Sequence, residues 1–284
     1  MTEASVKGGG SIMPRGGEES KRLRGFLNPS SGRPTRYLNR RVAQGHGVIA
    51  VIVATITSFV VLVLVIAALG LLITHVLTHG PLGTWDRHVI RWLDVHRGRT
   101  LDRLSGDATN LADTFEIAGV AAVVTVVLLL RRWGRHAFLL VAGLVIELSV
   151  FLASNWIVKR PRPSVHHLGG TPSTYGFPSG HTAATVMLYG GVVLLVMVAT
   201  TRRFPRIAAW LVAIALTLAV GLSRVYRGEH YPTDVIAGFL LGICSLVAGV
   251  FIIRVADLNH SRQSVEGKDS IEADRANRLD QAPK

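Results

Sequence analysis

Two histidines in this chain lie in short polar segments that also carry arginine, glycine and a carboxylate. His181 ends the sequence FPSGH at residues 177–181, and His230 lies in SRVYRGEHYPTD at residues 223–234. Imidazole side chains supply nucleophilic and proton-transfer chemistry near neutral pH. Asp234 follows His230 by four residues, so a helix beginning between them would let its carboxylate reach the ring and fix the tautomer. The pattern predicts a histidine-based reaction.

Arginines and a helix start beside these histidines indicate an anionic substrate. Arg162 and Arg224 are permanent cations whose forked donors match phosphate oxygens. Ser179 and Gly180 precede a long apolar run, and the free N–H groups at the start of a helix favour an anion. Gly180 also permits close approach of the backbone. Together these residues predict a phosphate site.

Metal ions and nucleic acids fit the sequence less well. The predicted phosphate site has arginines and helix starts but no cluster of carboxylates, so we expect neither a metal nor another cofactor. The formal net charge is +13, but many basic residues lie in the N-terminal segment or between apolar runs. That distribution is typical of membrane orientation rather than of a nucleic-acid surface. Six further histidines show no metal-ligand spacing: His75, His79, His88, His96, His166 and His167.

Long apolar runs must position these polar segments. Only 17% of the residues are charged, whereas a soluble domain carries about a quarter. Six runs reach or approach the length that crosses a bilayer: 48–77, 115–130, 136–158, 181–200, 207–222 and 233–253. The expected fold is all-α, an integral membrane bundle of six transmembrane helices at residues 47–256. Polar tails are expected at residues 1–46 and 257–284, and residues 85–95 are typical of an amphipathic interfacial helix.

The basic residues between the runs predict the orientation in the membrane. With six spans, three arginine-rich segments fall on one side, together with the C-terminal tail. Their arginines are Arg33, Arg36, Arg40, Arg41, Arg131, Arg132, Arg135, Arg202, Arg203 and Arg206. The positive-inside rule makes that side cytoplasmic, so both termini are expected there. Loops 78–114, 159–180 and 223–232 then face outward, which predicts a multi-pass cell-membrane protein with an extracytoplasmic active site.

These segments resemble the type-2 phosphatidic acid phosphatase superfamily, in its membrane branch of undecaprenyl diphosphate and lipid phosphate phosphatases. The family signature has three blocks: Lys-x6-Arg-Pro, Pro-Ser-Gly-His and Ser-Arg-x5-His-x3-Asp. The second block is complete at residues 178–181, and the third is complete at residues 223–234 with the family spacing. The first block appears in part, as Arg162-Pro163. The resemblance covers residues 115–254 and is strong because two complete blocks occur in the right order.

The resemblance implies a role for each matching residue. His230 would attack phosphorus and form a phosphohistidine, Asp234 would activate His230, and His181 would protonate the leaving oxygen. The phosphate oxygens would be held by Arg162, Ser179, Gly180 and Arg224. The family requires no metal, since arginines neutralise the charge that a divalent cation would otherwise neutralise.

One departure from the family pattern concerns a cation. The family has lysine seven residues before Arg162, and this chain has Asn155 there. Lys159 lies one helical turn beyond Asn155 on the same face, so Lys159 or Arg160 is expected to replace the missing cation at the phosphate. Otherwise the site works with one fewer cation. Arg160 could also bind the second phosphate of a diphosphate.

The expected function is hydrolysis of a lipid phosphate or diphosphate at the outer membrane face. The leading substrate is undecaprenyl diphosphate, whose hydrolysis would recycle a lipid carrier of cell-wall synthesis; phosphatidic acid and phosphatidylglycerol phosphate stay open. A non-catalytic lipid-phosphate binder, allowed by Asn155, and a transporter, suggested by Glu147, are the alternatives of other classes. For Glu147, near the middle of the third run, we favour a structural role facing the bundle. The expected partners are the lipid substrate and the bilayer, and the sequence gives no oligomeric state.

Overall fold

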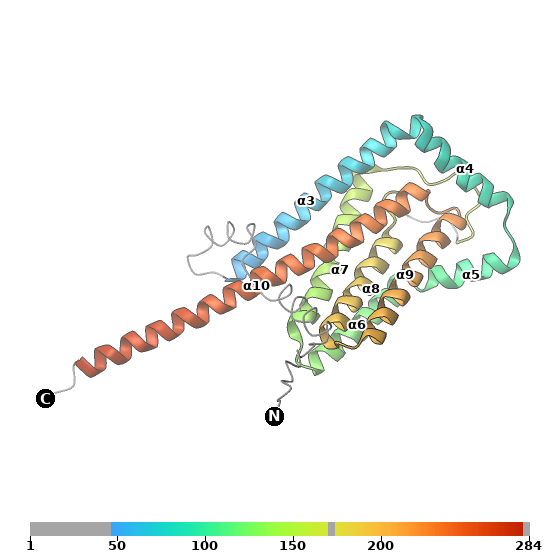
Figure 1. The fold of residues 1–284 in the computed structure, drawn as a ribbon. Coiled ribbons are helices and arrows are strands. Elements are labelled where there is room, and N and C mark those ends of the chain that lie inside the picture. The colour runs from blue at the N-terminus through green and yellow to red at the C-terminus, as the bar shows by residue number, and fades with distance from the viewer. Residues whose placement is uncertain (1–46, 170–173, 281–284) are drawn as a thin grey trace, which may run out of the picture.

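The computed structural model describes residues 47–169 and 174–280, and side chains as far as residue 256. The predicted tail at residues 1–46 and the last four residues lie outside this part of the chain. All regular structure in the described ranges is helical (Figure 1). The elements are α3 (Gly47–His75), η1 (Leu77–His79), α4 (Pro81–Val95), α5 (Arg99–Asn110), α6 (Thr114–Leu130), α7 (Gly134–Val158), α8 (Gly180–Ala199), α9 (Arg203–Tyr226) and α10 (Pro232–Asp280).

Five of the predicted membrane runs are confirmed as helices long and apolar enough to cross a bilayer. They are Val48–His79, Gly134–Val158, Gly180–Ala199, Arg203–Tyr226 and Pro232–Ala256. The sixth predicted run corresponds to α6, which has 17 residues. It is joined to α5 across a bend of 46°, and the pair makes a sixth candidate span if it is counted as one. The all-α membrane fold predicted from the sequence is therefore confirmed, with five to six candidate spans.

Two helices cover the end of the bundle that carries the motif loops. The predicted amphipathic helix is present as α4, which begins with Pro81 at its first position. Helix α5 was not predicted, because its 12 residues are mostly polar and form no apolar run. It packs against α9 and buries Ser105 and Thr109. The outward loop expected at residues 78–114 is thus largely helical.

Close helix packing fixes where the motif loops begin. At Gly242, a Cβ atom would lie 2.5 Å from the Cβ of Val186, so the glycine lets α10 approach α8. At Gly70 on α3, a Cβ would lie 2.5 Å from the ring of Phe177, which is fully buried. These contacts join α10 to α8, and α3 to the segment that leads into α8. The loop that carries the second sequence block is therefore part of the packed core.

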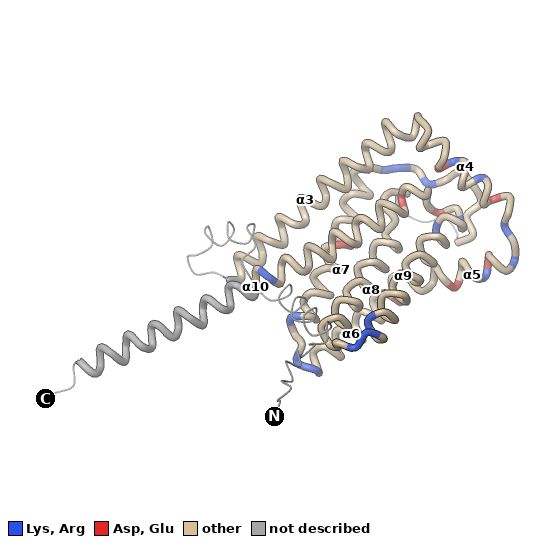
Figure 2. The backbone as a smooth tube through the Cα atoms, viewed as in Figure 1, with Lys and Arg blue, Asp and Glu red and all other residues tan. Residues whose placement is uncertain are grey.

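Both complete motif segments lie at the same end of the bundle. Figure 1 shows that α7 ends, α8 begins, α9 ends and α10 begins at this end, beside α4. The arginine-rich turns after α6 and after α8 lie at the opposite end (Figure 2). This arrangement agrees with the predicted separation of the motif loops from the basic loops across the bundle.

Candidate active site

The second sequence block forms the start of α8. Ser179 occupies the N-cap position, and its backbone N–H donates to the carbonyl oxygen of Asp234 at 3.0 Å. Its hydroxyl is fully buried and lies 3.0 Å from the hydroxyl of Thr182. Gly180 and His181 line a cavity of 550 Å³, whereas Ser179 is not part of its wall. The structure therefore gives the Ser179 side chain a part in shaping the helix start.

The ring of His230 is held by the backbone of the loop before α8. Its Nδ1 lies 2.7 Å from the carbonyl oxygen of Gly176, an acceptor, so Nδ1 carries the proton and donates it. Its Nε2 is then unprotonated and lies 3.3 Å from Nη1 of Arg162. Burial, helped by the nearby cations of Arg224 and Arg162, lowers the pKa of His230 well below 6.5. A neutral imidazole with an unprotonated Nε2 is the form required of a nucleophile, and here that nitrogen accepts a hydrogen bond from Arg162.

Asp234 lies further from His230 than the sequence predicts. Its Oδ2 is 4.0 Å from Nδ1 of His230, and this oxygen accepts the backbone N–H of Tyr231 at 2.9 Å. Its Oδ1 accepts a hydrogen bond from Arg160 at 2.5 Å. The carbonyl of Gly176 therefore makes the hydrogen bond to the ring that was expected of Asp234. Asp234 instead fixes the turn before α10 through its bonds to Tyr231 and Arg160.

Arg160, which the sequence predicts at the phosphate, lies outside the wall of this cavity. Its side chain is 2% exposed and is absent from the cavity wall. Its Nη2 donates to Oδ2 of Asp86 at 2.8 Å, and its Nη1 donates to Asp234 and, at 2.7 Å, to the hydroxyl of Thr233. The hydroxyl of Thr233 in turn donates to Asp86 at 2.6 Å. The Arg160 guanidinium thus joins α4 to the start of α10, and its charge is matched by two buried carboxylates.

The cavity wall includes neither Lys159, a predicted replacement for the missing cation, nor Asn155. Lys159 ends α7 with a φ of 49°, is exposed, and places its ammonium 5.6 Å from the centre of the Trp156 ring, away from the cavity. Asn155 is 2% exposed and donates to the carbonyl oxygens of Tyr175 and Phe177, both at 2.9 Å. Its own Oδ1 accepts the backbone N–H of Tyr175 at 3.1 Å. The residue in the family lysine position therefore holds the loop that orients His230.

Arg162 and Arg224 line the cavity, as the sequence predicts. Nη1 of Arg162 donates to the carbonyl oxygen of Glu229 at 2.7 Å, while its Nε and Nη2 donate to Thr174. Burial lowers the pKa of Arg162 from its ordinary value, against the opposing effect of nearby carboxylates. Arg224 donates to the hydroxyl of Thr109 at 2.8 Å and is paired with the buried carboxylate of Glu229. Glu229 was not singled out from the sequence, since its contact depends on the sharp turn after α9.

A second carboxylate that sequence reasoning missed lies beside His181. Oδ1 of Asp113 is 3.1 Å from Nε2 of His181. Asp113 occupies the N-cap position of α6, yet its side chain makes no capping hydrogen bond. The two residues are 68 positions apart, so no local spacing could have indicated the contact.

The cavity has a polar end and a long apolar side. Its polar end is formed by Arg162, Arg224, His181 and His230. Its apolar side lies between α6, α7 and α8 and consists of Ile117, Ala118, Leu144, Val145, Leu148, Phe151 and Ala184. A neighbouring hollow of 350 Å³ shares Leu144 and Val145 and continues along α6 and α7. An anion bound at the histidines would therefore have an apolar path leading away from it.

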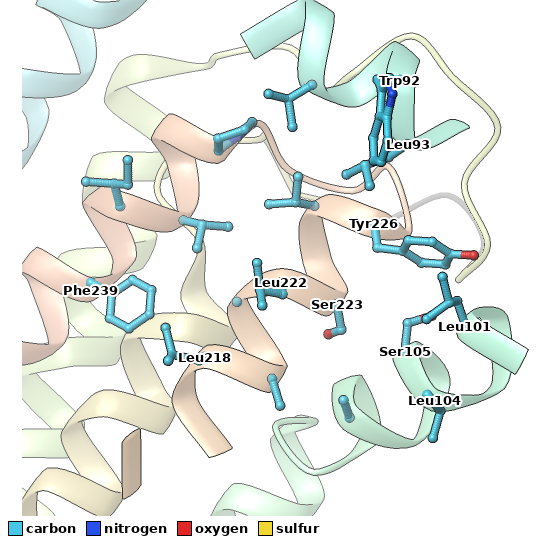
Figure 3. A pocket seen from close by; sticks show the side chains of 18 of the residues that line it. Trp92, Leu93, Leu101, Leu104, Ser105, Leu218, Leu222, Ser223, Tyr226 and Phe239 are labelled. Atoms are coloured by element: carbon cyan, nitrogen blue, oxygen red, sulfur yellow. The ribbon is translucent and has the colours of Figure 1, made fainter. Parts of the chain in front are cut away.

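A larger hollow of 890 Å³ lies outside this site. It is lined by apolar side chains of α4, α5, α9 and α10, including Trp92, Leu101 and Phe239 (Figure 3). Neither His181 nor His230 lines it, although Ser223 of the third sequence block does. The chemistry-bearing residues therefore gather in the smaller cavity.

Residues 136–257, which include α7, α8, α9 and both histidines, match the family model described as the PAP2 superfamily. These residues form a PAP2 superfamily domain. The resemblance stated from the sequence motifs is confirmed for this part of the chain. Asp86, Thr109 and Asp113 lie before the PAP2 match, so α4, α5 and α6 add contacts to its site.

Curated relatives cover the same region. A protein of Sulfolobus acidocaldarius named undecaprenyl-diphosphatase is 33% identical over 125 residues, which are 42% of this chain and 56% of that protein. Phosphatidylglycerophosphatase B of Bacillus subtilis is 31% identical over 121 residues, 40% of this chain and 55% of that protein. The chain thus spans about half the length of these relatives.

A solved structure extends the likeness in fold beyond the PAP2 match. The crystal structure of the first transmembrane PAP2 type phosphatidylglycerolphosphate phosphatase from Bacillus subtilis superposes with a TM-score of 0.56. The likeness covers 72% of this chain and 96% of that chain, with 21% sequence identity. At this identity the comparison establishes a shared membrane fold.

Proposed function

We propose that this protein is a membrane lipid phosphatase in which His230 carries the phosphoryl group. The observation that supports this most directly is the composition of the 550 Å³ cavity. It joins two histidines and two arginines to an apolar wall that continues along α6 and α7. The start of α8 adds backbone N–H groups at the same place. Such a site suits a substrate with a phosphate head and a hydrocarbon tail.

The proposed reaction has two steps of bond exchange. Nε2 of His230 attacks phosphorus; the bond from phosphorus to the leaving oxygen breaks, and His181 gives that oxygen a proton. Water then attacks the phosphohistidine, His181 takes a proton from the water, and the phosphorus–nitrogen bond breaks to release inorganic phosphate. Arg162, Arg224 and the N–H groups at the start of α8 stabilise the charge on the phosphoryl oxygens during both steps.

The length of the apolar side supports a lipid rather than a small soluble ester. The hollows reach from Thr114 to Val126 along α6, a rise of about 18 Å at about 1.5 Å per residue. This is more than half of a hydrocarbon core of about 30 Å. A lipid tail in this path would lie with its phosphate at the histidines. The membrane character of the bundle provides access for such a substrate.

Two observations favour different head groups for the substrate. Undecaprenyl diphosphate was the leading prediction, and the name of the Sulfolobus relative supports it. Arg160, expected at the second phosphate, is however paired with Asp86 and Asp234. We therefore place a lipid phosphate monoester first and undecaprenyl diphosphate second.

Hydrolysis tests the proposal directly. Purified protein in detergent should release phosphate from one or more of phosphatidylglycerol phosphate, phosphatidic acid and undecaprenyl diphosphate. His230→Ala should abolish both release and the labelled phosphoenzyme, while activity should survive EDTA. A labelled phosphoenzyme in His230→Ala would contradict the assignment. Binding of lipid phosphates by wild type without any turnover would favour the non-catalytic binder.

The outward position of the site is also a proposal. It is supported by the arginine-rich turns at the far end of the bundle. Ser164 and Arg132 are exposed at opposite ends, so each can report its side when changed to cysteine in a Cys244→Ser background. In intact cells an impermeant thiol reagent should label the Ser164→Cys protein and spare Arg132→Cys. The reverse result would place the site in the cytoplasm.

A further inference from the structure

Glu147 is a buried carboxyl group that the proposed reaction does not use. It lies on α7, is 3% exposed, and lines the same cavity as His181 and His230. Within the described part of the chain its carboxyl group makes no hydrogen bond and no ion pair. Its neighbours on the cavity wall of α7 are the apolar Leu144 and Leu148. The cavity therefore contains an unpartnered polar group beneath its arginines.

An unpartnered buried carboxyl group is costly to the folded protein. Removing a polar group from water without a compensating hydrogen bond costs on the order of 1–3 kcal/mol in proteins. Leucine at this position would avoid that cost and would fill the wall between Leu144 and Leu148. Arg160 and Asp234 show the contrast, because the charged groups buried there are fully paired. A ligand that enters the cavity can supply the partner that Glu147 lacks.

The position of Glu147 relative to the phosphate site defines which ligand atoms it can meet. Phe151 lies one helical turn from Glu147 toward the outer end of α7, and its ring would lie 3.0 Å from a Cβ built on Gly180. Phe151 is thus level with the start of α8, where the phosphate is proposed to bind. One turn is about 5.4 Å, so Glu147 lies one turn deeper along α7 than Phe151, a few covalent bonds from the proposed phosphate position. This is the depth of the first carbons of the leaving group.

We propose that Glu147 accepts a hydrogen bond from a hydroxyl group on the leaving alcohol, close to the ester that is cleaved. The inference rests on the proposed lipid phosphatase function and narrows its substrate class. It favours lipid phosphates whose alcohol carries a second hydroxyl, such as the glycerol hydroxyl between the two phosphates of phosphatidylglycerol phosphate. In undecaprenyl diphosphate the leaving group is itself a phosphate, which has no alcohol hydroxyl to donate to Glu147.

A matched pair of substrates tests this contact. The pair is phosphatidylglycerol phosphate and its analogue with a propanediol in place of that glycerol, which lacks only the hydroxyl. Wild type should show a kcat/KM at least about tenfold higher for the hydroxylated lipid, or roughly 1.4 kcal/mol, within the range of a hydrogen bond in a protein. Glu147→Leu should bring the two values together, and Glu147→Gln, which keeps an acceptor oxygen, should retain part of the preference. Glu116→Gln, an exposed change in the first turn of α6, is the matched control and should keep the full preference.

Each outcome separates this inference from the proposed function. Turnover of both lipids by wild type with a preference below twofold would overturn the role of Glu147 and leave the phosphatase intact. An equal fall in kcat/KM for both lipids in a folded Glu147→Leu protein would also overturn the role of Glu147 in recognising the hydroxyl group. It would indicate that the carboxyl group is structural. If Glu147→Leu does not fold, the ratio of kcat/KM for the two lipids, measured in wild type and in Glu147→Gln, still tests the role of Glu147. Absence of turnover on every lipid phosphate would overturn the proposed function together with this inference.

Discussion

The carbonyl oxygen of Gly176 lies 2.7 Å from Nδ1 of His230, which makes a backbone atom the orienting partner of the proposed nucleophile. A histidine oriented by a carbonyl keeps its proton on Nδ1 and presents Nε2 to the substrate. The loop that provides this carbonyl is tied to α7 through Asn155 and to α3 through Phe177. The reactivity of His230 therefore depends on residues that never touch phosphate.

The pH dependence of turnover should reflect the depressed pKa of His230. Burial and the cations of Arg224 and Arg162 lower this pKa well below 6.5, so the neutral, attacking form persists on the acid side. After correction for ionisation of the substrate phosphate, kcat/KM should not fall as the pH decreases through 6.5, and its decline should begin at lower pH. An acid limb centred at pH 6.5 or above would contradict the neutral, buried ring.

The same group links stability to pH. The unfolded chain takes up a proton on His230 near pH 6.5, whereas the folded protein keeps the ring neutral. Its contribution to the free energy of unfolding is thus complete above pH 6.5 and is lost as the pH falls below it. Thermal unfolding of wild type and His230→Gln at pH 7.5 and pH 5 measures the effect, and the variant should lose less stability between them.

Asn155→Lys should damage the protein, although it restores the family residue. The three hydrogen bonds between Asn155 and residues 175–177 are lost, and an ammonium group is placed in a position that is 2% exposed. We expect a loss of about 1–3 kcal/mol in stability, and a fall in kcat because the carbonyl of Gly176 moves. Thermal unfolding and phosphate release measure the two effects. A variant more active than wild type would show that the missing cation outweighs the loop contacts.

Lys159→Ala should change kcat/KM by less than about twofold, the effect of an ordinary surface substitution. Its ammonium group lies over Trp156 outside the cavity, so its charge does not contact a phosphate bound in the cavity. Arg162→Ala is the contrasting variant, since Arg162 lines the cavity beside Nε2 of His230 and should be needed for turnover. A tenfold loss in Lys159→Ala would mean that its side chain moves to the phosphate when the substrate binds.

Arg160→Gln should destabilise the protein more than it changes substrate affinity. The substitution leaves the carboxylates of Asp86 and Asp234 buried without their cation, and breaking such a pair costs about 3–5 kcal/mol. KM should stay near the wild-type value while kcat falls, because the start of α10 loses its anchor. Arg87→Gln, an exposed neighbour of Asp86, is the control and should leave the thermal midpoint unchanged. A raised KM with unchanged stability would indicate that Arg160 binds the substrate phosphate.

The parts of the fold and site that could be predicted are those coded by local patterns. Continuous apolar runs identified five spans. Helix α5 was not identified because it is mostly polar, and its packing on α9 buries Ser105 and Thr109 without an apolar run. His181 and His230 stood out because short spacings place them at the starts of helices. The residues that contact the site from distant parts of the chain could not be predicted from local spacing. Asp86 and Arg160 are 74 residues apart and meet only once α4 packs against the start of α10.

The contact between Asp113 and His181 is expected to determine how well the enzyme handles poor leaving groups. A carboxylate beside an imidazole favours the protonated ring and fixes its orientation, which are the requirements of a general acid. Asp113→Ala should therefore slow hydrolysis of a lipid alkyl phosphate by about tenfold or more and slow that of p-nitrophenyl phosphate far less, since nitrophenolate leaves without a proton. In the His181→Ala background the same substitution should add little, because residues that act as one unit are not additive. Stability should change little, as the Asp113 side chain makes no capping bond to α6. Glu116→Ala, in the first turn of α6, should leave both rates unchanged. Equal slowing of both substrates by Asp113→Ala would mean that the carboxylate shapes the cavity instead of supporting proton transfer by His181.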